Sequence, residues 1–170
     1  MSPSPFIFEW IARCAASGRA RARALDVAMG RGRHALLLAH AGFLAFGVDI
    51  AFDAVRDAVA AAAAEGVVLH GWCADLTQHP LPAARFDLIV VCRYLQRDLF
   101  DALRAACAPG GVVLYETFTT AQRALGTGPK SPDHLLEPGE LRERFEGFEE
   151  LFYEETTAPE AVARIVARRS

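Results

Sequence analysis

The sequence predicts an α/β fold: a mostly parallel sheet of seven strands, with helices on both faces and an antiparallel hairpin at the C-terminal end. Three observations support it. Runs rich in Val, Leu and Ile alternate with helix-forming segments, as in a parallel sheet covered on both faces. A glycine-containing loop joins the first of these runs to a helix. The last two apolar runs are joined by a connection too short for a crossover helix, so we expect them to pair antiparallel.

The N-terminal segment is predicted to be a helix followed by a connector. Pro5 suits the first turn of a helix over residues 6–16, whose apolar side chains lie roughly on one face. Residues 1–18 are therefore an N-terminal helix and a candidate lid. We interpret the alternating arginines at positions 19, 21 and 23 as a solvated connector, with a basic patch as the alternative.

Strands and helices then alternate at regular intervals. The predicted strands are residues 24–27, 44–48, 67–72, 86–92 and 112–116, and the predicted helices between them are residues 33–40, 52–64 and 96–106. The helix over 52–64 contains a run of alanines, which are strong helix formers, and stops before Gly66.

Periodicity is lost after the fifth strand. Residues 117–137 contain several glycines and prolines, which predicts a long loop with a functional role, such as a lid. A helix over 139–145 follows Pro138, and strands over 150–155 and 162–167 close the chain. We see no internal repeat or linker, so residues 1–170 are predicted to form a single domain.

Composition limits the function classes. The chain has 170 residues, of which 52% are hydrophobic, and a net charge of −3, which argues against nucleic-acid binding through a broad basic surface. The four cysteines form no C-x-x-C pair, so we expect no metal site and a reducing, cytoplasmic setting. No apolar run approaches the ~20 residues needed to cross a bilayer, and no membrane partner is expected.

The loop after the first strand is the most specific feature. Residues 24–34 read ALDVAMGRGRH, in which a strand end, small residues and a helix start follow one another. Such a loop brings backbone N–H groups to a nucleotide-like ligand. A dinucleotide fingerprint would need a small residue where Arg33 stands. The pattern that begins with Asp26 therefore favours a ligand without a pyrophosphate. The alternative is structural: Asp26 would cap the loop or the helix, and the glycines would allow left-handed backbone angles.

Two further acids stand at strand ends. Asp49 closes the second strand, where its two oxygens can accept both hydroxyl protons of a ribose; the alternative is a helix N-cap. Asp75 follows the third strand, where it can accept from the exocyclic amine of adenine; the alternative is a turn residue. Three acids at three successive strand ends indicate one adenosyl ligand more specifically than any one of them does.

Candidate catalytic residues lie at the ends of the fourth and fifth strands. Arg93 and Tyr94 would face a group transferred from the ligand, with a surface ion pair and a packing ring as alternatives. Glu116 could orient a substrate or cap the loop. Arg31, Arg33 and His34 place positive side chains at a helix N-terminus, which a ligand carboxylate would offset; exposed arginines are the alternative. The weaker candidates are His134, Tyr153 and Glu154.

Taken together, the chain resembles the class I S-adenosylmethionine-dependent methyltransferases from residue 24 to about 167. The resemblance rests on the motifs LDVAMGRG at 25–32, VD at 48–49, ADL at 74–76, FDLI at 86–89 and PGG at 109–111. Within that class it is most similar to the tellurite-resistance methyltransferases, through Gly32–Arg33, PGELR at 138–142 and FEGFE at 145–149.

The resemblance implies a Rossmann-like fold and S-adenosyl-L-methionine as the cofactor. It implies that the methionine part is held by Asp26, Ala28, Gly30 and Gly32, the ribose by Asp49, and the adenine by Asp75. The expected cofactor-binding residues also include Ile50, Leu76 and Cys92. The chain departs from the family where Ala28 replaces a glycine, where Met29 replaces a cysteine, and where the short segment 156–160 replaces a polar one.

The expected function is methyl transfer to a small acceptor that is soft or already anionic, such as a thiol or a chalcogen oxyanion, because no strong base is evident. Residues 117–137 and the helix at 6–11 are expected to form the lid. The alternatives are a non-catalytic cofactor-binding or partner-binding subunit, an RNA or protein methyltransferase, and an NAD(P)-dependent oxidoreductase. Arg33 and the lack of a Tyr-x-x-x-Lys pair argue against the last.

Overall fold

The computed structural model describes residues 2–18 and 21–170. Within them, seven strands form one sheet in the order β3-β2-β1-β4-β5-β7-β6. The strands are β1 (Arg23–Val27), β2 (Leu44–Asp49), β3 (Leu69–Cys73), β4 (Phe86–Cys92), β5 (Cys107–Phe118), β6 (Glu149–Glu155) and β7 (Val162–Arg168). β1 to β5 are parallel, and β7 runs antiparallel to both β5 and β6. The predicted fold class is confirmed.

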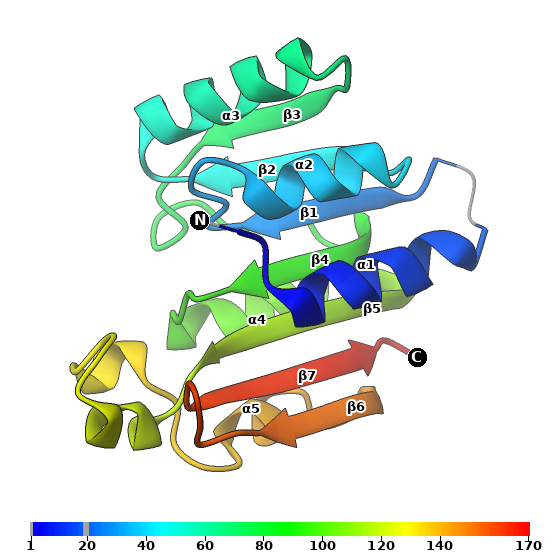
Figure 1. Cartoon of the computed structure of the whole chain (residues 1–170). Helices are drawn as coiled ribbons and strands as arrows, with labels where there is room; N and C mark the ends of the chain where they lie inside the picture. The colour runs from blue at the N-terminus through cyan, green and yellow to red at the C-terminus, as the bar shows by residue number, and fades with distance from the viewer. Residues whose placement is uncertain (1, 19–20) are drawn as a thin grey trace.

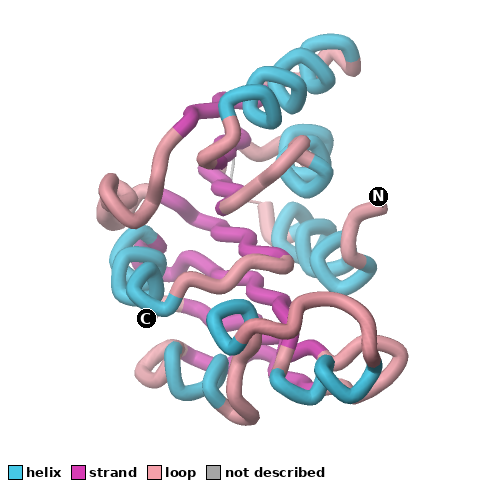
Figure 2. Tube along the Cα trace, turned by 90° about the vertical axis from the view of Figure 1, so that its left-hand side faces the viewer, coloured by secondary structure: helices cyan, strands magenta, loops and turns pink. Residues whose placement is uncertain are grey.

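Helices cover the two faces of the sheet unequally (Figures 1 and 2). The long helices are α1 (Pro5–Ala16), α2 (Arg33–His40) and α3 (Phe52–Ala64), and the short ones are α4 (Phe100–Ala106) and α5 (Glu140–Arg144). The side chains of α1, α2 and α3 pack into one apolar cluster, and those of α4 and α5 into a second. Alternation along β1 sends Ala24 into the first cluster and Leu25 into the second.

Most predicted boundaries agree with the structure to within two residues, and the differences have identifiable causes. The helix expected over 96–106 begins as a 3-10 turn, η1 (Arg97–Leu99), before α4. The strand predicted over 112–116 begins earlier, at Cys107, which pairs with Phe86 of β4, and it continues to Phe118, because residues 112–118 pair with β7. The sequence predicts that this strand ends at Glu116 and that a loop begins at Thr117. In the structure both residues lie inside β5.

The segment 117–137 is more ordered than a simple loop. It contains η2 (Thr120–Leu125) and η3 (Pro132–His134). Leu135 and Leu136 are fully buried, and Leu136 bridges to Thr119. Both ends of the segment are therefore fixed to the sheet, which confines any lid movement to its middle.

α1 packs into the hydrophobic core of the fold. Phe6, Ile7 and Ile11 are buried in the same apolar cluster as α2 and α3. The part of the N-terminus that remains available for a lid is the segment 2–5 before it. Among the described residues, no helix combines the length and hydropathy that crossing a membrane requires.

Candidate functional site

The candidate site lies at the carboxyl ends of β1, β2 and β4, and its innermost acid is Asp26. This side chain is 1% exposed and accepts a hydrogen bond of 2.9 Å from the backbone N–H of Ala35, in the first turn of α2. Burial raises its pKa to about 7, and the nearby charge of Asp49 raises it as well. A buried carboxyl group of this kind is ready to pair with an arriving cation.

The loop from Ala28 to Gly32 is held in left-handed backbone conformations. Ala28, Gly30 and Gly32 have φ angles of 54°, 54° and 78°. A Cβ on Gly32 would lie 2.8 Å from the Cβ of Ala58, so this glycine is needed for α2 to approach α3. A Cβ on Gly30 would meet nothing within 4 Å, so Gly30 leaves open space at the edge of the sheet.

Asp49 connects this loop to the end of β2. Its carboxylate accepts from the backbone N–H of Gly30 at 2.8 Å and of Ala51 at 2.9 Å. It is not the N-cap residue of α3, because that position is Ala51, whose side chain makes no capping hydrogen bond. Beside it, Ile50 is 68% exposed, which leaves an apolar surface that a ligand's ring could cover.

Asp75 lies next to Asp49, because the backbone N–H of Ala74 donates to the Asp49 carbonyl at 3.0 Å. Its Oδ1 accepts from the Thr77 hydroxyl at 2.7 Å and from the Thr77 backbone N–H at 2.9 Å. These hydrogen bonds lower its pKa. The turn role considered for Asp75 is therefore present, while the following Leu76 packs against the apolar cluster.

The side chain of Met29 packs beneath the loop, against β2 and β3. It is 5% exposed, and its Sδ would lie only 2.1 Å from a Cβ placed on Gly47. Its Cε likewise approaches Gly71, at 3.5 Å from a Cβ placed there. Glycines in β2 and β3 therefore make room for the methionine side chain, and Met29 also lines the hollow beside the loop.

His34 fastens the N-terminal segment to the start of α2. Its Nε2 accepts a hydrogen bond of 3.1 Å from the Ser4 backbone N–H. Burial, helped by the charge of Arg33, lowers its pKa to about 4. The expectation of a positive side chain is therefore wrong for His34. Arg33 also reaches this segment, with Nη1 3.4 Å from the Ser2 carbonyl.

Arg93 and Glu116 belong to an ion-pair network that the sequence did not reveal. Glu116 is 1% exposed and lies 2.6 Å from the Arg164 Nε and 3.6 Å from the Arg93 Nε. Arg93 also pairs with Glu160 at 2.5 Å, and its guanidinium lies 4.3 Å from the ring centroid of Phe118. With two guanidinium groups beside it, the Glu116 carboxylate is better suited to positioning these arginines than to removing a proton from a substrate.

Cys92 and Tyr94 flank Arg93. The Cys92 thiol donates to Glu116 at 3.7 Å, and burial raises its pKa to about 12, so it stays protonated. The Tyr94 hydroxyl bonds to Gln96, and its pKa is raised by burial and by the carboxylates of Asp75, Asp98 and Asp49. Tyr94 thus lies on the side of the predicted adenosyl site.

Two adjoining hollows open between these groups. One, of about 390 Å³, is lined by Ala28, Gly30 and Cys92 among others. The other, of about 410 Å³, lies between the N-terminal segment 2–5 and Phe118. Arg33 and Arg93 line both hollows. The two hollows can therefore hold two ligands side by side, with guanidinium groups between them.

Of the weaker candidates, His134 and Tyr153 lie elsewhere, and Glu154 joins the network of Glu116 through Arg164. His134 is exposed in η3, the ring of Tyr153 is covered by the Arg142 guanidinium at 4.0 Å, and Glu154 pairs with Arg164 at 2.8 Å. Among the described residues, no cluster of His, Cys, Asp or Glu could hold a metal ion.

Comparisons with known proteins find a family model and solved structures of similar fold. A family model described as a methyltransferase domain matches residues 24–111. The solved structure titled for thioacetal formation from a disulfide bond in echinomycin biosynthesis is 22% identical, with a TM-score of 0.75, and the match covers 99% of this chain and 82% of that one. TehB from Haemophilus influenzae is 18% identical, with a TM-score of 0.77, over 94% of this chain and 61% of that one.

An S-adenosylmethionine-dependent methyltransferase from Mesorhizobium loti is 20% identical, with a TM-score of 0.72, over 95% of this chain and 98% of that one. A comparison with curated protein sequences finds no match. At these identities the structural likenesses show a shared fold, and the resemblance to the tellurite-resistance family stays a prediction.

Proposed function

Because the chain belongs to the methyltransferase domain family and uses S-adenosylmethionine, we propose that it methylates a small acceptor that is soft or anionic. The observation that carries this proposal is the pair of adjoining hollows that share Arg33 and Arg93. The hollow against the glycine loop suits the cofactor's methionine part, and the hollow under residues 2–5 suits the acceptor.

The residues of the open edge fit this cofactor. The buried carboxyl of Asp26 would pair with its ammonium group, Asp49 would accept from the ribose, and Asp75 would accept from the adenine amine. Exposed Ile50 offers its apolar surface to the base. Bound there, the cofactor supplies an electrophilic methyl group on a sulfonium.

The chain's part in the reaction is orientation and exclusion of water. The residues of the chain would align the acceptor's lone pair with the methyl group, which the bound cofactor would supply with a neutral thioether as its leaving group. Holding the reactants in line contributes about 7–11 kcal/mol in favourable cases. Arg33 and Arg93 would hold an anionic acceptor, and residues 2–5 with the middle of 117–137 would close over it.

The groups beside the acceptor hollow support an acceptor that needs no deprotonation. Glu116 is neutralised by two arginines, His34 uses Nε2 to accept from Ser4, and Cys92 keeps its proton. A thiolate or a chalcogen oxyanion fits these conditions, and we propose a cytoplasmic location. The second candidate is a non-catalytic cofactor-binding subunit, which the ion pairs already occupying Arg93 favour.

Two measurements test the proposal. S-adenosylhomocysteine at ~100 times its dissociation constant stabilises a protein by about 2.7 kcal/mol, so it should raise the melting temperature, whereas NADH should leave it unchanged. Methyl transfer from labelled cofactor to a panel of thiols, selenite and tellurite should then give turnover. Cofactor binding without turnover on any of these acceptors would favour the non-catalytic subunit.

A further inference from the structure

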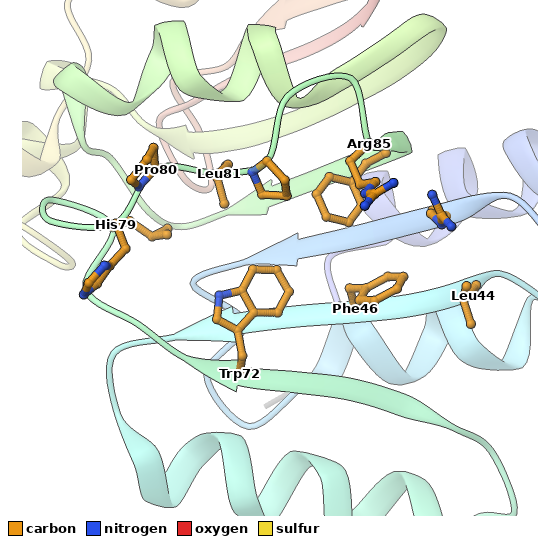
Figure 3. Close-up of a pocket in the computed structure, with 11 residues that line it drawn as sticks. Leu44, Phe46, Trp72, His79, Pro80, Leu81 and Arg85 are labelled. Atoms are coloured by element: carbon orange, nitrogen blue, oxygen red, sulfur yellow. The ribbon is translucent and has the colours of Figure 1, made fainter.

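A third hollow lies on the opposite face of the sheet, away from α2 and α3 (Figure 3). It encloses about 510 Å³. Its floor is formed by the side chains of Leu44, Phe46 and Trp72, on β2 and β3, and its wall by Pro80 and Leu81. We call it the β2–β3 groove. It shares no lining residue with the two hollows of the proposed methyl-transfer site.

The groove exists because one crossover has no helix. The connection from β3 to β4, residues 74–85, contains turns and bends only, whereas α2 and α3 follow β1 and β2. Alternation along β2 sends Ala45 into the helix-covered cluster, while Leu44 and Phe46 line the groove. Phe46 and Trp72 are only partly buried. Large apolar side chains therefore stand where no helix covers them.

The rim of the groove is positively charged. Arg23, at the start of β1, and Arg85, just before β4, both line it, and none of its lining residues is an acid. In the described part of the chain, neither guanidinium has a salt bridge or a hydrogen bond. The acid nearest to Arg85 in sequence is Asp87. Its carboxylate accepts from the backbone N–H of Arg23, and the residue lines a separate hollow together with Cys14.

We propose that the β2–β3 groove binds a small amphipathic anion, with an apolar body on Phe46 and Trp72 and an acidic group at Arg23 and Arg85. Its volume lies within the range of about 300–1,000 Å³ that is usual for small-molecule sites. A mostly apolar lining with a few polar groups is likewise typical of such sites. In Figure 3, Arg85 lies at the end of the groove near Leu44, so the acidic group would sit there and the apolar body would extend toward Trp72 and His79.

The test uses the full chain carrying Trp10→Phe, which leaves Trp72 as the only tryptophan. Titration with 4-phenylbutyrate should change the Trp72 emission saturably. The matched neutral probe, 4-phenylbutyramide, should bind at least tenfold more weakly. The double variant Arg23→Gln, Arg85→Gln should remove this preference for the acid, whereas Arg56→Gln, an exposed arginine on α3, should keep it.

Binding of S-adenosylhomocysteine, followed by thermal shift, shows that each variant is folded. Leu76, which lines the groove and is also an expected cofactor contact, is unchanged in all of them. Equal affinity for the acid and the amide would overturn the proposal, as would a double variant that still prefers the acid. The absence of any saturable change up to 10 mM probe, or self-association that buries the groove, would overturn it too.

Discussion

At the scale of single residues, Asp26 makes stability depend on pH. Its pKa is about 7 in the folded protein against about 3.9 in an unfolded chain. Between these values the folded state holds the proton more tightly, so Asp26 contributes stability at low pH that is lost as the pH rises from 4 to 7. Above pH 7 the difference amounts to at most about 4 kcal/mol.

We therefore expect Asp26→Asn to remove this pH dependence, because asparagine imitates the protonated carboxyl and its oxygen can still accept from Ala35. Urea unfolding at pH 4.5 and pH 8 measures the effect. The variant should gain stability over the wild type at pH 8 and bind S-adenosylhomocysteine at least tenfold more weakly, because the ammonium loses its carboxylate. A variant as pH-dependent as the wild type would contradict the assignment.

His34 has the opposite pH dependence. Its pKa is about 4 in the folded protein and about 6.5 when unfolded, so its contribution is complete above pH 6.5 and is lost as the pH falls toward 4. Protonated His34 cannot accept from Ser4. We expect the Ser4 amide signal in NMR spectra to titrate with a midpoint near pH 4. In His34→Gln, whose oxygen can accept at every pH, the titration should be absent, and its persistence there would assign it to another group.

Ala28 carries strain that a glycine would relieve. Its φ of 54° lies in the left-handed region, which costs a non-glycine residue about 1–2 kcal/mol. Ala28→Gly should stabilise the chain by about 0.5–1 kcal/mol after the larger entropy of unfolded glycine is subtracted. The matched control Ala60→Gly, at an exposed position inside α3, should destabilise by about 1 kcal/mol. Urea unfolding compares the two, and equal losses would show that Ala28 is unstrained.

At the scale of elements, the segment 117–137 separates into anchors and a free middle. Gln122 is 1% exposed, its Oε1 accepts from the Ala161 backbone N–H at 2.8 Å, and its Nε2 donates to the Thr127 carbonyl at 3.0 Å. Leu135 and Leu136 fix the other end. A deletion that removes these anchors would damage the fold, so a test of the lid must spare them.

We expect a variant in which residues 123–125 and 129–130 become glycine or serine, with residues 126–128 kept, to lose acceptor turnover by tenfold or more. Its affinity for S-adenosylhomocysteine should change less than threefold, since no lining residue of either hollow is altered. Steady-state kinetics and calorimetry measure the two quantities. Equal losses in both would show that the segment supports the cofactor site and is not a lid.

The elements also show how far sequence reasoning reaches. Local signals predicted α2 and α3 to the residue, since helical periodicity and Gly66 are read from neighbouring positions. The length of β5 depends on pairing with β7, and the open half of the sheet depends on a crossover without a helix. Both features depend on contacts between residues far apart in the sequence, so no local pattern predicts them.

The same distinction holds for the site. The acids Asp26, Asp49 and Asp75 could be placed because parallel strands end at one edge. The side-chain contacts around them could not be predicted. Ser4 bonds to His34, 30 positions away in the sequence, and Arg164 bonds to Glu116, 48 positions away. Such pairs arise only when α1 and β7 pack beside β4 and β5, so the network around Arg93 was not predictable.

At the scale of the whole molecule, ligand binding should stabilise one edge of the sheet and leave the rest unchanged. Hydrogen exchange with and without S-adenosylhomocysteine measures this for every element. The loop 28–32 and the strand ends at 49–51, 74–77 and 92–95 should be protected, because the cofactor would bridge β1, β2, β3 and β4. α5 and β6, at the far end of the sheet, should exchange at unchanged rates, and so should residues 80–85 beside the β2–β3 groove. Protection of residues 80–85 alone would move the cofactor into that groove, and uniform protection would mean that binding tightens the whole fold.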